Sequence, residues 1–205
     1  MDHRKEQVSL RGKGDFFTRI ARRRGYRSRA AFKLIEANRR FSFIGRGDCV
    51  VDVGAYPGGW TQVARSVVGD KGYVLALDVK RMEKFPQSNV KLLVGDVTDP
   101  TTKARVSRVL PRSADVVISD ISPRISGVRE LDTELQGDLL EATVEIAKDV
   151  LKVGGTVFLK GFQGNRFNGF VDGLKRHFRS IRLFKPKASK QKSGEIYLLA
   201  RGFER

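Results

Sequence analysis

Short apolar runs rich in β-branched residues alternate with longer amphipathic segments from residue 49 onward. The apolar runs predict buried strands at 49–53, 73–77, 90–94, 116–119, 156–159, 181–184 and 196–200. Segments of helical length lie between them, at 59–68, 101–110, 134–151 and 166–177. Because strands and helices alternate, we expect an α/β fold with a doubly wound, mostly parallel sheet.

The sequence indicates where two of the predicted helices begin or end. Apolar residues recur at helical spacing over 132–151, and Gly154 and Gly155 are expected to end that helix. Ahead of the first strand, Ser28 is expected to cap a helix that continues to about residue 40. This second helix belongs to a basic segment that precedes the sheet.

The composition is that of a globular chain with a strong charge bias. With 205 residues, 40% of them hydrophobic, the chain suits one domain around a single core. Its apolar runs are far shorter than the ~18 residues of a membrane-spanning helix, and the N-terminus lacks a signal-peptide stretch. The single cysteine, Cys49, gives no disulfide framework. We therefore expect a cytoplasmic, monomeric protein without membrane association.

The formal charge of +17 predicts a polyanionic partner, and it is concentrated at the two ends of the sequence. Residues 1–40 hold 13 Lys and Arg against 4 Asp and Glu, and residues 160–205 hold 12 against 3. If the two ends meet in space, they form one phosphate-binding face with salt-dependent affinity. The alternative is a basic surface that serves solubility only. The basic residues nearest the candidate chemistry are Arg22, Arg23, Arg24, Arg27, Arg29, Lys185, Lys187, Lys190 and Lys192.

The segment DVGAYPGGW at 52–60 follows the first strand and has the features of a ligand-binding loop. In doubly wound sheets the ligand lies beyond the carboxyl ends of the strands, where the strand order reverses. Gly54, Gly58 and Gly59 allow the backbone to turn and to approach a ligand, and Trp60 opens a helix. The spacing differs from the dinucleotide fingerprint G-x-G-x-x-G, which disfavours NAD.

Three aspartates, Asp52, Asp78 and Asp96, end successive strands. Asp78 is placed to accept hydrogen bonds from ribose hydroxyls, and Asp96 to hold the exocyclic amine of an adenine. Three carboxylates suit a ligand that combines adenosine with a positive centre, as S-adenosylmethionine does. The alternative is that Asp78 and Asp96 are ordinary turn or capping residues.

Five ordered motifs resemble those of the FtsJ family of RNA ribose 2'-O-methyltransferases, and the resemblance spans about residues 26 to 201. They are SRAAFKL (28–34), DVGAYPGGW (52–60), SDISPRISG (119–127), FLKGFQG (158–164) and KSGEIYLLA (192–200). The sequence departs from the family at Tyr56, where a small residue is usual, and at Gly161, where a larger apolar residue is usual. These departures concern the shape of the pocket.

The resemblance implies a Rossmann-like, class I methyltransferase fold, with a basic segment over 1–45 and a catalytic core over 46–205. It also implies a catalytic tetrad and a set of cofactor contacts. The tetrad falls on Lys33, Asp120, Lys160 and Glu195. The cofactor contacts fall on Gly58, Trp60, Asp78, Asp96 and Asp120. A tryptophan that opens a helix is as often a core residue, so both interpretations of Trp60 stay open.

The chemistry agrees with these residue types. Methyl transfer to a ribose hydroxyl requires alignment of donor and acceptor and removal of a proton. It needs no metal, and two histidines with one cysteine are too few for a zinc site. A lysine is a poor base at its usual pKa of about 10.4, which burial and a neighbouring cation lower. Lys160 facing Lys33 would be such a base, with Asp120 and Glu195 as orienting groups, although either lysine could take the proton.

The leading hypothesis is therefore an S-adenosylmethionine-dependent enzyme that methylates a 2'-hydroxyl of ribosomal RNA. The resemblance implies a uridine of the large-subunit RNA, so the expected partner is that RNA or the large ribosomal subunit. A tRNA anticodon loop or another structured RNA is the alternative substrate. Two alternatives of other classes are a non-catalytic RNA-binding module that retains the fold and a nicotinamide oxidoreductase with a basic surface.

Overall fold

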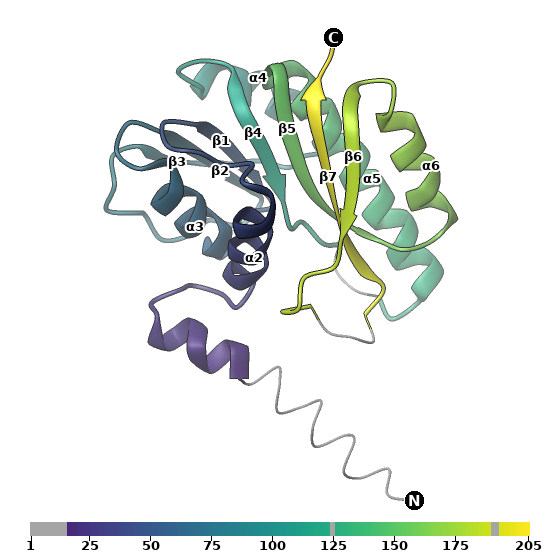
Figure 1. Ribbon diagram of the computed structural model, residues 1–205, viewed down its shortest axis with the longest axis horizontal. Coiled ribbons are helices and arrows are strands. Elements are labelled where there is room, and N and C mark those ends of the chain that lie inside the picture. Colours follow the sequence, from purple (N-terminus) through teal and green to yellow (C-terminus); the bar gives the residue numbers. More distant parts are fainter. Residues whose placement is uncertain (1–15, 124–125, 190–192) are drawn as a thin grey trace, which may run out of the picture.

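Seven strands form one sheet in the order β3-β2-β1-β4-β5-β7-β6 (Figure 1). Their bounds are Cys49–Val53 (β1), Tyr73–Asp78 (β2), Val90–Val94 (β3), Ala114–Ser119 (β4), Leu151–Phe162 (β5), Phe178–Phe184 (β6) and Glu195–Phe203 (β7). Strands β1 to β5 pair in parallel, whereas β7 is antiparallel to both β5 and β6. This confirms the α/β fold with a mostly parallel sheet.

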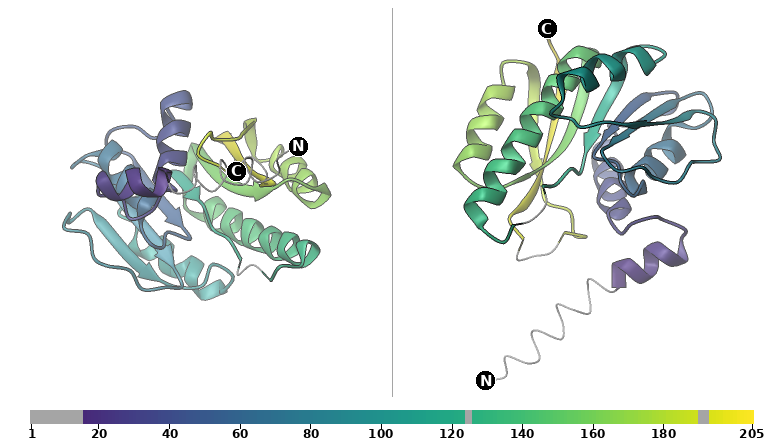
Figure 2. Two further views of the ribbon diagram at one scale, coloured as in Figure 1. Left: turned by 90° about the horizontal axis from the view of Figure 1, so that it is seen from below. Right: turned by 180° about the vertical axis from the view of Figure 1, so that it is seen from behind.

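Helices cover both faces of the sheet in this computed structural model, which describes residues 16–123, 126–189 and 193–205 (Figure 2). One face holds α2 (Ala31–Phe41) and α3 (Gly59–Val68), and the other holds α4 (Pro100–Val109), α5 (Arg129–Val150) and α6 (Asn165–Leu174). Every residue of β1 and β4 is buried, since each lies between two helical layers. Continuous burial explains why these strands are unbroken apolar runs in the sequence.

The start of α2 differs from the sequence prediction. The helix begins at Ala31, and its N-cap is Ala30, which makes no side-chain capping hydrogen bond. Ser28 instead faces α3: a Cβ on Gly59 would lie 2.2 Å from the Ser28 hydroxyl oxygen. The expectation that Ser28 caps the helix is therefore wrong, because its side chain packs on a neighbouring helix.

The junction of α5 and β5 also differs from the prediction. The helix ends at Val150 and the strand begins at Leu151, so Gly154 and Gly155 lie within the strand and do not end the helix. Leu151 is fully buried and pairs with Ala114 of β4. Its burial forces the chain into the sheet before the glycines are reached.

Residues 16–23 form a further helix, which lies ahead of α2 and was not predicted (Figure 1). None of the helices in the described ranges is long and apolar enough to cross a membrane. Some residues of the sequence predictions lie outside the described residues: His3, Arg124, Ile125, Lys190, Lys192 and the remainder of 1–15.

The two basic ends of the sequence meet beside α2. The Lys187 backbone N–H donates a hydrogen bond of 2.9 Å to the Glu36 carboxylate, and the Phe41 and Phe184 rings lie 5.2 Å apart. The Arg40 guanidinium lies 5.4 Å from the centre of the Phe184 ring. The condition for a shared phosphate-binding face, that the two ends meet, is thus fulfilled for the described residues.

Candidate active site

A cavity of about 720 Å³ opens at the carboxyl ends of β1, β2, β3 and β4. Its walls include Gly54, Asp78, Asp96, Asp120 and Leu139. The cavity lies where the strand order reverses between β1 and β4, the usual ligand position in such sheets. Its volume falls within the ~300–1,000 Å³ of small-molecule and cofactor sites.

Gly54 makes this cavity possible because it joins two loops at close range. Its φ is +73°, in the left-handed region that favours glycine. A Cβ at this position would lie 2.6 Å from Cβ of Ile121, in the segment after β4. The Gly54 backbone N–H donates to the Leu77 carbonyl at 2.8 Å. Only glycine therefore allows the loop after β1 to touch both neighbouring strand ends.

Asp78 and Asp96 make local hydrogen bonds and also line the cavity. One Asp78 oxygen accepts from the Tyr56 backbone N–H at 2.9 Å, and the other accepts from the Lys80 N–H at 2.8 Å. Asp96 accepts from the backbone N–H of Thr98 at 2.9 Å. Both aspartates thus order local turns, and both also line the cavity. Their carboxylate oxygens retain lone pairs that could accept hydroxyl or amine hydrogens of a ligand.

Asp52 lies deeper than the other two strand-end aspartates. It is 1% exposed, and it accepts a hydrogen bond of 2.6 Å from the Thr61 hydroxyl. Burial, together with the charges of Asp120 and Asp78, raises the pKa of Asp52 to about 7 although the Thr61 bond opposes the shift. Asp52 borders a second, smaller cavity of about 40 Å³ that it shares with Asp120.

Trp60 is placed mainly as a core residue. Its side chain is 3% exposed and stacks on Phe158, with 5.6 Å between the ring centres. The indole N–H donates to the Ala30 carbonyl at 2.8 Å, which fixes the start of α2. Trp60 also borders the smaller cavity. Because the indole N–H has a protein partner, this placement favours the core interpretation of Trp60.

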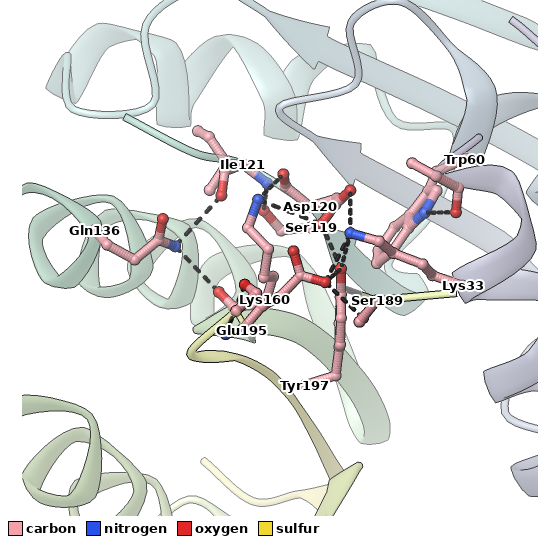
Figure 3. A network of polar contacts seen from close by, with 12 residues as sticks. Lys33, Trp60, Ser119, Asp120, Ile121, Gln136, Lys160, Ser189, Glu195 and Tyr197 are labelled. Carbon is pink, nitrogen blue, oxygen red and sulfur yellow. Dashed lines mark hydrogen bonds and ion pairs between the residues drawn. The ribbon is translucent and has the colours of Figure 1, made fainter. Parts of the chain in front are cut away.

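Lys33, Asp120, Lys160 and Glu195 converge around Asp120, which also lines the main cavity (Figure 3). Lys33 comes from α2, Asp120 follows β4, Lys160 lies in β5, and Glu195 begins β7. The Lys33 ammonium nitrogen lies 2.7 Å from Glu195 Oε1 and 3.8 Å from Asp120 Oδ2. The Lys160 nitrogen lies 3.4 Å from Asp120 Oδ1 and donates to the Asp120 backbone carbonyl at 2.7 Å. The expected convergence of these four residues is confirmed.

Tyr197 stands at the centre of this cluster, and the sequence prediction missed it. Its hydroxyl donates to Asp120 Oδ1 at 2.7 Å and lies 3.1 Å from Glu195 Oε1, while Lys33 donates to it at 2.8 Å. Burial, strengthened by the two carboxylate charges, raises the pKa of Tyr197 well above its usual value, so the hydroxyl keeps its proton. Because Tyr197 lies two residues after Glu195 in β7, the period of a strand could have identified it.

Glu195 is held in its charged form despite being largely buried. Burial alone raises the pKa of Glu195, but the Lys33 charge and the hydrogen bonds from Lys33 and Ser189 outweigh it and place the pKa below its usual value. The Ser189 hydroxyl donates to Glu195 Oε1 at 2.7 Å. The segment before β7 therefore helps to position a residue of the cluster, a role that the sequence did not indicate.

Gln136 of α5 braces the backbone of the cluster from behind. Its side-chain amide donates to the Lys160 carbonyl at 3.1 Å and to the Ile121 carbonyl at 3.3 Å (Figure 3). The side chain is buried, and its carbonyl oxygen has no hydrogen-bond partner among the described residues. Gln136 thus connects the strand of Lys160 to the segment that holds Asp120.

The structure shows the contacts of the two residues that depart from the family pattern, Tyr56 and Gly161. Tyr56 is 49% exposed at the wall of the main cavity, and the Lys80 ammonium lies 5.0 Å from the centre of its ring. At Gly161 a Cβ would lie 2.2 Å from a ring carbon of Phe167, which α6 buries against β5. Phe167 therefore fills the space that a larger residue at position 161 would need.

Comparison with known proteins agrees with this site. A family model described as FtsJ-like methyltransferase matches residues 26–203. The chain is 41% identical over 192 residues to the ribosomal RNA large subunit methyltransferase E of Methanothermobacter thermautotrophicus, covering 94% of this chain and 91% of that protein. It is also 41% identical over 196 residues to the protein of the same name from Archaeoglobus fulgidus, covering 96% of this chain and 100% of that protein.

A solved structure shares the fold over most of the chain. A protein described as a ribosomal RNA methyltransferase from Plasmodium falciparum matches with a TM-score of 0.76 at 27% identity, covering 87% of this chain and 98% of that one. The family match includes every residue of the converging cluster, from Lys33 to Glu195. The chain therefore belongs to the FtsJ-like methyltransferase family.

Proposed function

We propose that this protein is an S-adenosylmethionine-dependent enzyme that methylates a ribose 2'-hydroxyl in large-subunit ribosomal RNA. The observation that carries the proposal is the cluster of Lys33, Asp120, Lys160 and Glu195, which meets a cofactor-sized cavity at Asp120. Two relatives that cover nearly all of this chain are named as large-subunit ribosomal RNA methyltransferases, which supports ribosomal RNA over tRNA as the substrate.

The cavity suits S-adenosylmethionine in size and in its donor set. Asp78 and Asp96 would hold the ribose and the adenine, and the loop at Gly54 and Gly58 would lie against the rest of the cofactor. Asp120 is the one wall residue that also contacts both lysines, so the transferred methyl group belongs at that end. The cofactor supplies an electrophilic methyl group on a positive sulfur, and the protein has to supply alignment and a proton acceptor.

We assign the proton transfer to Lys160 and the positioning of the ribose to Lys33. Lys33 is held by two carboxylates and by the Tyr197 hydroxyl, so its ammonium is fixed as a hydrogen-bond donor. Lys160 has one carboxylate within 4 Å and donates otherwise to a neutral backbone carbonyl. Loss of a proton from Lys160 therefore disrupts fewer charged contacts than loss from Lys33. Asp120 lies between the two nitrogens and orients both.

The basic segments around α2 would bind the RNA backbone. Arg22, Arg23 and Arg24 are exposed just ahead of α2, and Lys187 is tied to the same helix through Glu36. Contacts with phosphates position an RNA without reading its bases, and the reacting 2'-hydroxyl distinguishes RNA from DNA. The cluster thus lies beside the surface that would deliver a ribose to it.

Methyl transfer from tritium-labelled cofactor to RNA tests the proposal. We expect Lys160→Ala to lower turnover by about 10²–10⁴-fold, the usual contribution of a general base, while cofactor affinity changes little. Lys175→Ala, which removes an exposed lysine of the same charge near the end of α6, should retain wild-type turnover. Substantial turnover by Lys160→Ala would remove the residue from the mechanism.

Mapping the modified nucleotide identifies the substrate. We expect transfer to large-subunit ribosomal RNA at a uridine, and we compare naked RNA, the assembled subunit and tRNA as acceptors. Transfer to tRNA alone would replace the proposed substrate, and RNA binding without transfer would indicate a non-catalytic module. Action as a monomer in the cytoplasm remains part of the proposal, tested by sedimentation and by localisation of the tagged protein.

A further inference from the structure

Arg27 is one of the basic residues expected on the RNA-binding surface, but its side chain faces the protein. The guanidinium donates to the Glu83 carbonyl at 2.9 Å, to the Lys84 carbonyl at 3.1 Å and to the Pro57 carbonyl at 3.4 Å. It also lies 3.9 Å above the centre of the Phe85 ring. Since both terminal nitrogens donate to carbonyls, this arginine is poorly placed to contact a phosphate.

The carbonyls that Arg27 contacts belong to two loops that enclose the cofactor cavity. Pro57 lies in the glycine loop after β1, and residues 83–85 lie in the loop that follows β2. This second loop begins with Val79 and Lys80, which line the main cavity next to Asp78. It has no helix or strand over 79–89. Within the described residues, the Arg27 side chain is the one that makes hydrogen bonds to the backbone of this loop between residues 81 and 86.

Gly58 provides the space in which Arg27 reaches both loops. Its φ is +108°, and a Cβ there would lie 2.8 Å from a Phe85 ring carbon and 3.0 Å from an Arg27 nitrogen. The arginine, the ring and the glycine loop are thus in direct contact. The backbone of this segment is fixed as well: Gln62 of α3 accepts from the Arg27 N–H at 2.7 Å and donates to the Gly25 carbonyl at 2.8 Å.

We propose that Arg27 is a positioning residue for the cofactor, which fastens the loop of residues 79–86 to the glycine loop and so fixes one wall of the cavity. The inference rests on the proposed function, because it assumes that the cofactor binds against this wall of the cavity. A guanidinium suits this task because its planar fork reaches several carbonyls and stacks on a ring at the same time. Without the guanidinium, the loop would become ordered only when the cofactor binds, and the entropy cost of this ordering would lower cofactor affinity.

Calorimetric titration of the full chain with S-adenosylmethionine tests the inference. We expect Arg27→Ala to raise the dissociation constant about tenfold or more, the loss typical of hydrogen bonds to a charged group. Arg27→Lys should resemble Arg27→Ala, since an ammonium lacks the fork. Phe85→Leu keeps the apolar contact but removes the aromatic face, so it should raise the constant about threefold. Arg108→Ala removes the same charge from an exposed position of α4 and should leave cofactor affinity within about twofold.

Steady-state kinetics distinguish a positioning role of Arg27 from a general loss of stability. In Arg27→Ala we expect the KM for the cofactor to rise while turnover at saturating cofactor stays within about threefold of wild type. Wild-type cofactor affinity in Arg27→Ala, with RNA binding alone weakened, would overturn the inference and return Arg27 to the phosphate contacts. Failure of the wild-type chain to bind S-adenosylmethionine would instead refute the proposed function, so the two failures are distinguishable.

Discussion

At the scale of single residues, the site depends on charges that burial makes sensitive to their surroundings. Lys33 and Glu195 form a pair 2.7 Å apart in which each side chain is largely buried. Removing one partner of such a pair leaves an uncompensated charge, which costs more than the pair itself contributes. Asp52 is the opposite case, since the hydrogen bond that it accepts comes from the neutral hydroxyl of Thr61.

The stability of the protein should fall between about pH 4 and pH 7 because of Asp52. Its pKa is about 7 in the folded chain and near 3.8 when unfolded, so the unfolded chain releases this proton first as the pH rises. The contribution of the neutral carboxyl is therefore present at low pH and is lost as the pH rises through 7. We expect the free energy of unfolding of Asp52→Asn, relative to that of wild type, to increase by up to about 4 kcal/mol as the pH rises over this interval.

Urea unfolding at pH 4, 6 and 8 measures this effect as the difference between Asp52→Asn and wild type. Asp70→Asn, which changes an exposed aspartate, serves as the control and should run parallel to wild type. Parallel curves for Asp52→Asn as well would show that Asp52 ionises at the same pH in the folded and unfolded chains.

The sequence identified residues that belong to local motifs, and it missed those that act through a fold contact. Lys33, Asp120, Lys160 and Glu195 each lie in a recognisable motif, so their convergence was predictable. Tyr197 lies in the last motif, at strand spacing from Glu195, but its role became evident only from the pairing of β7 with β5, which places it opposite Lys160. The inward side chain of Arg27 likewise depends on a loop more than 50 residues away in the sequence, which the charge pattern does not show.

At the scale of elements, the central strands were the most predictable and the connections the least. Strand β1 has the predicted bounds, because continuous burial on both faces leaves a clear apolar run. The edge strand β3 also has the predicted bounds, although its residues are only partly buried. The start of α2 and the junction of α5 with β5 were wrong, because tertiary contacts of Ser28 and Leu151 decide them. Local sequence signals predict the bounds of an element when the burial of its own residues determines them. They fail when contacts with a neighbouring element determine the bounds.

Helix α5 supports the chemistry through Gln136, and this role can be measured. Gln136→Leu removes the amide donor from the buried carbonyl of Lys160 and the partly buried carbonyl of Ile121. Each such loss costs about 1–3 kcal/mol and loosens the backbone of the cluster. We therefore expect turnover to fall about tenfold or more, with little change in the KM for the cofactor. Gln87→Leu, at an exposed loop position, is the matched control. A change in cofactor KM alone would contradict this role.

At the scale of the whole molecule, charge separates one side of the protein from the other. The exposed arginines precede α2 and the segment after β6 contacts α2 through Lys187 and Glu36, whereas α4, α5 and α6 cover the opposite face of the sheet. Arg166 on that opposite face is engaged by Glu134, Asp138 and Glu141. A polyanion is therefore expected to bind beside α2.

RNA affinity should decrease steeply with salt, since neutralised phosphates release counterions. We expect the combined change of Arg22, Arg23 and Arg24 to Ala to reduce the slope of log K against log salt by about 2, at ~0.7 per contact with single-stranded RNA. The combined change of Lys103, Lys148 and Lys175 to Ala alters net charge equally on the other face and should keep the wild-type slope. A flat salt titration of the wild-type protein would contradict binding through phosphates.

The position of β7 between β5 and β6 has a consequence for how the molecule matures. The cavity lies at the carboxyl ends of strands that precede residue 120, whereas the cluster around Asp120 is complete only when β7, which carries Glu195 and Tyr197, lies between two earlier strands. A chain interrupted before residue 195 would hold the parts of the donor pocket and Lys160, but it would lack the carboxylate and the hydroxyl that hold the Lys33 ammonium. We therefore expect methyl transfer to require the complete sheet, with β7 in place between β5 and β6.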